Sequence, residues 1–162
     1  MIRPVKADDA RGICGIYNYF VENTAVTFEE EPVSIREMEG RVRDIGGAYP
    51  WFVWEEEGGV LGYAYVNKFR DRPAYRYSAE LSIYVKSGHE GKGMGGKLFA
   101  RLLEAARESS LHVLVSAITV PNERSVGIHE KFEFVKVAQF DEIGYKLGGW
   151  RDVAYWELVL KK

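Results

Sequence analysis

The feature that most constrains the fold is a glycine-rich stretch in mid-chain, Glu90-Gly91-Lys92-Gly93-Met94-Gly95-Gly96-Lys97. A strand-like run, residues 79–85, precedes it, and a helix-like run, residues 98–106, follows it. In such a strand–loop–helix unit, glycines let the backbone turn sharply, and the N–H groups that open the helix are free to bind an anion. The pattern therefore predicts a phosphate-binding loop and leaves open which phosphate it binds.

The rest of the chain predicts one α/β domain over residues 1–162, with a mixed central sheet and helices on both faces. Alternation and turn signals indicate strands at 2–6, 51–55, 60–68, 79–85, 112–119, 134–140 and 154–160. Apolar periodicity and capping residues indicate helices at about 9–21, 34–45, 93–109 and 121–131.

Composition narrows the class of protein. Apolar residues make up 46% of the chain and the formal charge is −2, so the composition gives no basic face of the kind that nucleic acids require. The single cysteine, Cys14, is consistent with a reducing compartment, and its helical neighbours Ile13, Ile16 and Tyr17 favour a core position over a nucleophile. No apolar run approaches the roughly 20 residues of a membrane helix. We therefore expect a cytoplasmic protein without a nucleic-acid, membrane or metal partner.

Two common phosphate-binding loops do not match the glycine stretch. A P-loop needs Ser or Thr after its lysine, whereas Leu98 follows Gly96-Lys97 here. A dinucleotide loop follows the first strand of its fold, whereas this one comes after three or four predicted strands. A glycine turn without a ligand is the plain alternative, but glycines in the first turn of a helix would cost about 1 kcal/mol each.

The loop and its surroundings resemble the GNAT acetyltransferases. The family's coenzyme loop, Q/R-x-x-G-x-G/A, stands here as residues 90–95, with Glu90 in place of Gln or Arg. The similarity is greatest to the phosphinothricin and methionine sulfoximine N-acetyltransferase branch, through these pieces: Ile16-Tyr17-Asn18, Thr27-Phe28-Glu29-Glu30-Glu31-Pro32, Leu61-Gly62-Tyr63-Ala64, the strand 79–85, Pro121-Asn122 with Ser125 and His129, and Gly149-Trp150-Arg151-Asp152-Val153. The resemblance implies the GNAT fold, in which two parallel strands, here 81–85 and 113–118, splay apart.

The same resemblance implies acetyl-CoA as co-substrate. The pantetheine arm would pair with the backbone of Ile83, Tyr84 and Val85 between the splayed strands. Asn122 would hydrogen-bond the coenzyme besides capping its helix, and Lys131 would reach the phosphates. The pyrophosphate would lie on the amides of the loop, namely Gly91, Lys92, Gly93, Met94, Gly95 and Gly96. The charge of Lys92 would add a contact to the pyrophosphate; the alternative is that the Lys92 side chain is only solvated.

Acetyl transfer to an amine needs a base, because an α-amine with a pKa of roughly 8 is mostly protonated at neutral pH. Glu80, which opens the apolar strand before the loop, is the candidate; a solvent-facing glutamate at a strand end is the alternative. By resemblance, His129 stands where many GNAT enzymes carry the tyrosine that protonates the leaving thiolate. It is equally well interpreted as a packed or coenzyme-contacting histidine. A backbone N–H within 83–85 would stabilise the oxyanion.

Three arginines in residues 69–76 favour an acceptor with a carboxylate, which accepts paired hydrogen bonds from Arg; a solvated basic loop is the alternative. The residues expected to contact the acceptor are Phe28, Arg72, Pro73, Ala74, Tyr75 and Arg76. The resemblance also implies a homodimer, to which residues 149–152 contribute. Two other functions stay open: a GNAT enzyme that acetylates protein N-termini, and a non-catalytic acyl-CoA-binding module.

Overall fold

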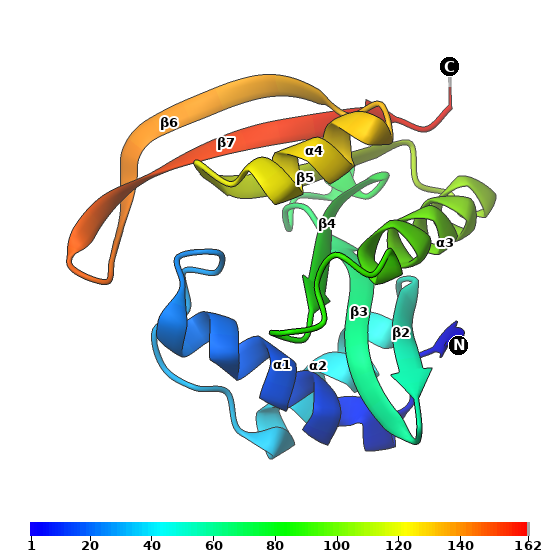
Figure 1. Cartoon of the computed structure of the whole chain (residues 1–162). Helices are drawn as coiled ribbons and strands as arrows, with labels where there is room; N and C mark the ends of the chain where they lie inside the picture. The colour runs from blue at the N-terminus through cyan, green and yellow to red at the C-terminus, as the bar shows by residue number, and fades with distance from the viewer. Residues whose placement is uncertain (162) are drawn as a thin grey trace.

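A computed structural model describes residues 1–161 as a seven-stranded sheet with four α-helices (Figure 1). The strands lie in the order β1-β2-β3-β4-β5-β7-β6, and only β4 and β5 are parallel neighbours. Their bounds are β1 Ile2–Pro4, β2 Trp51–Glu56, β3 Gly59–Lys68, β4 Ser78–Val85, β5 Val113–Val120, β6 Val135–Lys146 and β7 Gly149–Val159. The mixed sheet expected from the sequence is confirmed.

The predicted helices form with the predicted ends, within a residue or two. They are α1 Ala10–Asn23, α2 Ile35–Gly46, α3 Met94–Glu108 and α4 Glu123–Lys131, with short 3-10 turns at Ala7–Asp9 and Pro73–Tyr75. Two caps expected from the sequence are present: the Ser34 side chain accepts from the N–H of Glu37, and Asn122 accepts from the N–H of Ser125. Each satisfies one of the amide donors that a helix start leaves unpaired.

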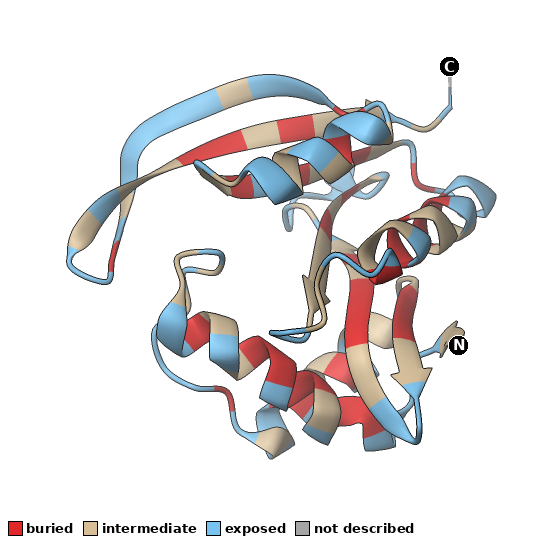
Figure 2. Cartoon of the chain, viewed as in Figure 1, coloured by how far each residue is buried: buried red, intermediate tan, exposed pale blue. Residues whose placement is uncertain are grey.

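Helices cover both faces of the sheet, and each face has its own core (Figure 2). Helix α3 buries Leu98, Phe99, Leu102 and Leu103 against one face. Helices α1 and α2 cover the other face through a second buried set: Ile13, Ile16, Tyr17, Val21, Met38 and Val42. The three-to-four-residue spacing of these positions is the amphipathic pattern that predicts the helices.

The pairing of β4 with β5 stops early and leaves a fork in the sheet. Only Ser78↔Val113, Ala79↔Leu114 and Glu80↔Val115 are paired. Beyond this point β4 stays paired with β3, and β5 stays paired with β7 up to Val120. The two halves of the sheet therefore part after Glu80, as the expected splayed strands require.

The C-terminal hairpin differs from the sequence prediction. The expected strands 134–140 and 154–160 are the inner parts of longer strands, β6 and β7, that meet in a tight turn at Leu147 and Gly148. The sequence pattern does not reveal this extension because the register shifts between Phe140 and Gly144, where Glu142 takes a positive φ of 53°. Such a bulge interrupts the alternation by which a strand is predicted.

Candidate active site

The glycine loop takes the conformation of an anion cradle. Gly91 and Gly93 have φ values of 77° and 79°, a left-handed region that favours glycine, and a Cβ on either would meet nothing within 4 Å. Gly93 is the N-cap of α3 and has no side chain that could bind the first amides of the helix. The N–H of Lys97 donates to the carbonyl of Gly93. The preceding amides, which open the helix, are therefore available to a bound anion.

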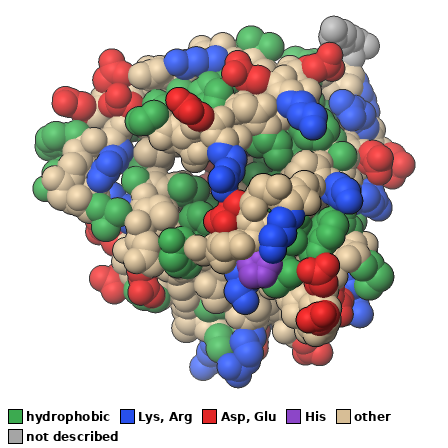
Figure 3. Space-filling model, in the orientation of Figure 1, with side chains coloured by type: hydrophobic (Ala, Val, Ile, Leu, Met, Phe, Trp, Pro, Cys, Tyr) green, Lys and Arg blue, Asp and Glu red, His purple; other side chains and the backbone are tan. Residues whose placement is uncertain are grey.

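A cavity of about 480 Å³ lies against this loop. A smaller one of about 50 Å³ lies in the fork between β4 and β5, and both are lined by Ile83, Tyr84, Asn122 and Ser125. The surface in Figure 3 is hollowed where Figure 1 places the space between the loop after α1 and helix α4. The predicted coenzyme residues that line the larger cavity are Ile83, Tyr84, Val85, Gly91, Gly93, Met94, Gly95, Gly96 and Asn122. Lys92 and Lys131 are exposed and line neither cavity.

Glu90, the residue that departs from the family pattern, has a local partner. Its carboxylate accepts a 2.8 Å hydrogen bond from the N–H of Gly88, two residues earlier in the turn. One carboxylate oxygen is therefore held by the turn that leads to Gly91, while Glu90 also lines the larger cavity. Glu90 thus supports the shape of the loop.

Glu80 lies at the point where the fork begins. Glu80 is half-buried at the last β4–β5 pair, and this burial raises the pKa of its carboxyl group. The positive charge of Arg70 lowers the same pKa and partly offsets the effect of burial. The opposite neighbour in β3 is Asn67, one residue before the strand ends. Glu80 itself lines neither cavity: the residues of β4 that line the fork cavity begin one residue later, at Leu81. From the loop 69–77, the charge of Arg70 acts on Glu80, whose raised pKa suits a group that accepts a proton.

The loop 69–77 joins β3 to β4 and exposes the predicted acceptor residues Arg72, Pro73, Ala74, Tyr75 and Arg76. Within residues 1–161, no ion pair engages Arg70, Arg72 or Arg76. Arg70, which was not among the predicted contact residues, is the arginine whose charge acts on Glu80. The loop therefore offers cationic side chains without an acidic partner in the described residues, one of which, Arg70, acts on the carboxylate.

Phe28, the other predicted acceptor contact, packs against the C-terminal hairpin. A Cβ built on Gly144 would overlap the Phe28 ring. Close by, the buried amine of Lys146 donates a 2.7 Å hydrogen bond to the carbonyl of Thr27. Phe28 does not line either cavity. The hairpin thus holds the loop after α1 in place, a long-range contact that no local pattern predicts.

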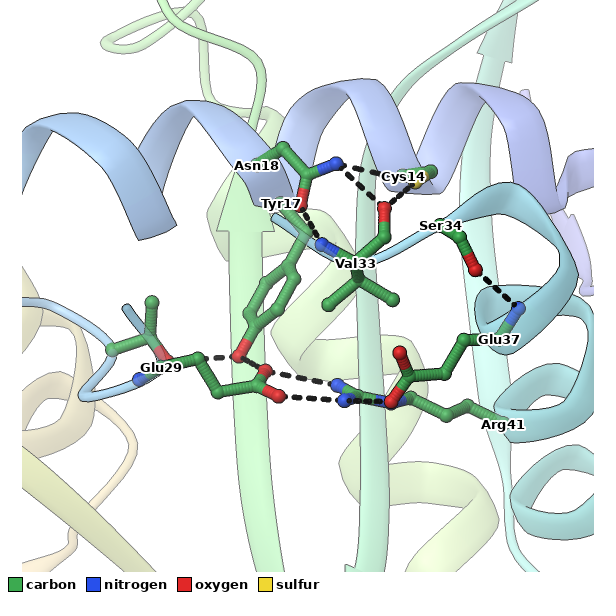
Figure 4. A network of polar contacts seen from close by, with 9 residues as sticks. Cys14, Tyr17, Asn18, Glu29, Val33, Ser34, Glu37 and Arg41 are labelled. Carbon is green, nitrogen blue, oxygen red and sulfur yellow. Dashed lines mark hydrogen bonds and ion pairs between the residues drawn. The ribbon is translucent and has the colours of Figure 1, made fainter. Parts of the chain in front are cut away.

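Figure 4 shows a polar network that ties the same loop to α1 and α2. Asn18 accepts from the N–H of Val33 at 2.8 Å and donates to its carbonyl at 2.9 Å. Glu29 accepts from the Tyr17 hydroxyl and takes two hydrogen bonds from Arg41, which hold the pKa of Glu29 below its usual value. Two of the sequence pieces that carry the family resemblance, 16–18 and 27–32, therefore meet in one network.

His129 is buried with both ring nitrogens engaged. Its Nδ1 lies 2.7 Å from the carbonyl of Ser125, and its Nε2 lies 2.8 Å from the Ser116 hydroxyl. Phe99 and Phe134 pack edge-on against the ring, and burial lowers its pKa. This environment favours a packed, neutral histidine. No local sequence pattern points to its partner Ser116.

Comparison with known proteins assigns the family. Residues 2–155 match the model described as an acetyltransferase (GNAT) domain, and the chain belongs to this family. It is 35% identical to a phosphinothricin N-acetyltransferase of Streptomyces viridochromogenes, over 96% of this chain and 85% of the relative. It is 37% identical to an L-methionine sulfoximine/L-methionine sulfone acetyltransferase of Salmonella typhimurium, over 98% of this chain and 94% of the relative.

Solved structures support the same assignment. A phosphinothricin acetyltransferase of Sinorhizobium meliloti in complex with acetyl-CoA superposes with a TM-score of 0.94 at 34% identity, covering 98% and 87% of the two chains. A ribosomal-protein-alanine N-acetyltransferase of Brucella melitensis gives 0.91 at 36% identity, covering 98% and 99%. This chain is accordingly an N-acetyltransferase that uses acetyl-CoA. In residues 1–161, no cluster of three His, Cys, Asp or Glu side chains could hold a metal, and no helix is long and apolar enough to span a membrane.

Proposed function

We propose that this enzyme acetylates the α-amine of a small amino-acid-like acceptor, of the phosphinothricin, methionine sulfoximine or methionine sulfone type, with Glu80 as general base. The observation that carries the proposal is the place of Glu80 at the start of the fork, one residue before the part of β4 that lines the fork cavity and near enough to Arg70 for that charge to lower its pKa. The names of the relatives support the acceptor class.

The coenzyme residues have separate tasks in this proposal. The N–H groups at the start of α3 hold the pyrophosphate, supported by the positive end of the helix. The backbone of Ile83 and Val85, unpaired on the β5 side, takes the pantetheine amides and directs the thioester toward Glu80. Lys92 and Lys131 lie exposed outside both cavities, so each would have to extend its side chain to reach the phosphates.

Transfer then proceeds by direct attack. Glu80 removes a proton from the acceptor ammonium, and the amine nitrogen attacks the thioester carbonyl carbon. A backbone N–H in 83–85 stabilises the oxyanion. The C–S bond then breaks, and the second proton of the nitrogen passes to the leaving sulfur, so that the amide and the coenzyme A thiol are released. The predicted acid, His129, has no free nitrogen, so its contacts favour a supporting role over proton donation to the thiolate.

The acceptor carboxylate is assigned to the arginine loop. Arg72 and Arg76 are exposed and form no ion pair in the described chain, so a carboxylate can take paired hydrogen bonds there without displacing an acidic partner. Arg76 donates one hydrogen bond to the Pro73 carbonyl, at 3.1 Å. Tyr75 and Phe28 provide apolar walls. The structural likeness to a ribosomal-protein-alanine N-acetyltransferase keeps a peptide acceptor as the second candidate, although a basic loop fits a free carboxylate better than a peptide chain.

A homodimer is part of the same proposal, with a second copy of this chain on the C-terminal hairpin. Trp150 and Tyr145 are 65% and 57% exposed, with ring centroids 5.0 Å apart, and Ile143 and Leu147 are exposed beside them. Apolar side chains gathered at one exposed tip indicate an interaction surface. The mass in solution tests this, and a monomer for wild type contradicts it. The cytoplasm is proposed as the compartment, in keeping with the single buried thiol of Cys14.

One experiment separates the candidates. The protein is incubated with acetyl-CoA and a panel of amino acids, methionine sulfoximine, methionine sulfone, phosphinothricin and short peptides, and thiol release is followed. Release with the small acceptors supports the proposal. Release with peptides alone favours the N-terminal acetyltransferase, and no release with any amine favours a non-catalytic acyl-CoA-binding module.

A further inference from the structure

The start of the β4–β5 fork carries a chain of three polar contacts that the reaction above does not use. It runs from the Ser125 carbonyl to His129 Nδ1 at 2.7 Å, from His129 Nε2 to Ser116 Oγ at 2.8 Å, and from Ser116 Oγ to the Leu81 carbonyl at 3.3 Å. Ser116 and His129 are each only 2% exposed. Leu81 is the first β4 residue beyond the last pair with β5.

These contacts cannot all be hydrogen bonds when His129 is neutral. Both ends of the chain are carbonyl oxygens, which only accept, so three links need three protons. A neutral imidazole and one serine hydroxyl supply two protons. The imidazolium form supplies the third. One link is therefore absent in the neutral state and all three form only when His129 is charged.

The geometry indicates which link is absent. The carbonyl of Ser125 is close enough to fix the ring proton on Nδ1, so Nε2 must accept, and the Ser116 hydroxyl donates to it. The longest contact, to Leu81, then has no proton. The side chains against the ring come from α3, β5 and the segment after α4, namely Phe99, Ser116 and Phe134, and none of them titrates. Burial lowers the pKa of His129, so the neutral form is the working state.

The consequence falls on the coenzyme site. Leu81 and Ser116 both line the fork cavity, between the strands that hold the pantetheine arm in the proposed function. We infer that neutral His129 draws the Ser116 hydroxyl to itself and leaves the Leu81 carbonyl to accept an amide N–H of the coenzyme arm, and that protonation of His129 turns the hydroxyl onto Leu81 and weakens coenzyme binding. Ser116 and His129 are thus positioning residues, and Leu81 is an additional backbone contact for acetyl-CoA. This inference rests on the proposed path of the arm.

The test is the dissociation constant of acetyl-CoA, measured without acceptor by calorimetry from pH 8 to pH 5, for wild type and Ser116→Ala. The coenzyme phosphates titrate equally in both, so the ratio of the two constants isolates the hydroxyl. At pH 8 the dissociation constants of the two proteins for acetyl-CoA should agree within about twofold. At pH 5 wild type should bind about 5-fold more weakly than Ser116→Ala, the size of one net hydrogen bond. His129→Gln, which keeps Ser116 but cannot be protonated, should also lack the extra weakening.

Thermal melting confirms that each variant is folded, and His129→Gln carries the comparison with wild type if Ser116→Ala does not fold. A wild-type-to-variant ratio that stays constant down to pH 5 overturns the inference. So does a loss of affinity above about 10-fold in Ser116→Ala at pH 8, because Ser116 would then be a direct ligand. If no amine gave thiol release, the proposed function would be refuted. The ratio of the acetyl-CoA dissociation constants would still be measurable, so the two failures are distinguishable.

Discussion

Glu80 lies directly opposite Val115, and this is the last residue pair of the parallel β4–β5 ladder. The carboxylate is therefore attached to the part of the sheet that is held on both sides, while the strands one residue later are free to take a ligand. A rigid base beside an open backbone is what positioned proton transfer requires.

Arg70 should control the protonation of Glu80. Its charge lowers a pKa that burial raises, so Arg70→Gln should raise the Glu80 pKa further and move the acid limb of kcat to higher pH. At saturating acceptor, turnover should fall at pH 6 and change little at pH 8.5. The matched variant Arg72→Gln should instead raise the acceptor KM, by about 10-fold for a lost charge-assisted pair, and leave the acid limb in place. Identical pH profiles for wild type and Arg70→Gln would contradict the assignment.

Gly93→Ala should weaken coenzyme binding through the backbone. A Cβ meets no neighbour there, but the left-handed φ of 79° costs a non-glycine residue about 1–2 kcal/mol, so the loop would leave its bound shape. The KM for acetyl-CoA should rise about 5- to 20-fold, with the acceptor KM little changed. Gly15→Ala, in an exposed position of α1 with no neighbour within 4 Å, is the control and should leave both constants unchanged. An unchanged acetyl-CoA KM in Gly93→Ala would show that this geometry is not needed.

Gly144→Ala should act on the acceptor side. The new methyl group overlaps the Phe28 ring and must displace it. We expect the acceptor KM to rise while the acetyl-CoA KM stays constant, in steady-state kinetics with each substrate varied. The double variant with Phe28→Leu should recover part of the loss, because the smaller side chain makes room, and a double-mutant cycle measures this coupling. Additive effects of the two changes would argue against the contact.

The pair of Arg3 and Asp9 should stabilise the N-terminal part of the fold. Asp9 is 7% exposed and takes two 2.8 Å hydrogen bonds from Arg3 and one from the N–H of Lys6. Burial opposes ionisation of Asp9, but these bonds prevail and lower its pKa. Asp9→Asn should cost about 2 kcal/mol of unfolding free energy in urea titrations near neutral pH.

The same pair gives a pH dependence with a defined sign. Because the folded pKa of Asp9 lies below its unfolded value, its contribution is complete above about pH 5 and is lost as the pH falls below about 4. The stability difference between wild type and Asp9→Asn should shrink over that range. A difference independent of pH would mean that the charge is not the stabilising feature.

The sequence predicts the parts of this enzyme that depend on local patterns. The glycine loop, the strand before it and the cap at Asn122 follow from residue type and spacing. The length of the β4–β5 pairing, the contact of Phe28 with Gly144 and the link from Ser116 to His129 join residues far apart in the chain. No local periodicity encodes such contacts, so the shape of the fork and the environment of His129 emerge only with the fold.

The most direct test of the central claim is the pH–rate profile of Glu80→Gln against wild type, with acetyl-CoA affinity measured in parallel. Glutamine matches the size of Glu80 but cannot accept the proton. Glu80→Gln should bind acetyl-CoA within about twofold of wild type, turn over at least about 100-fold more slowly at neutral pH, and lose the acid limb that the raised pKa of Glu80 imposes. Turnover equal to wild type between about pH 6 and 9, the range in which an amine acceptor titrates, would contradict it.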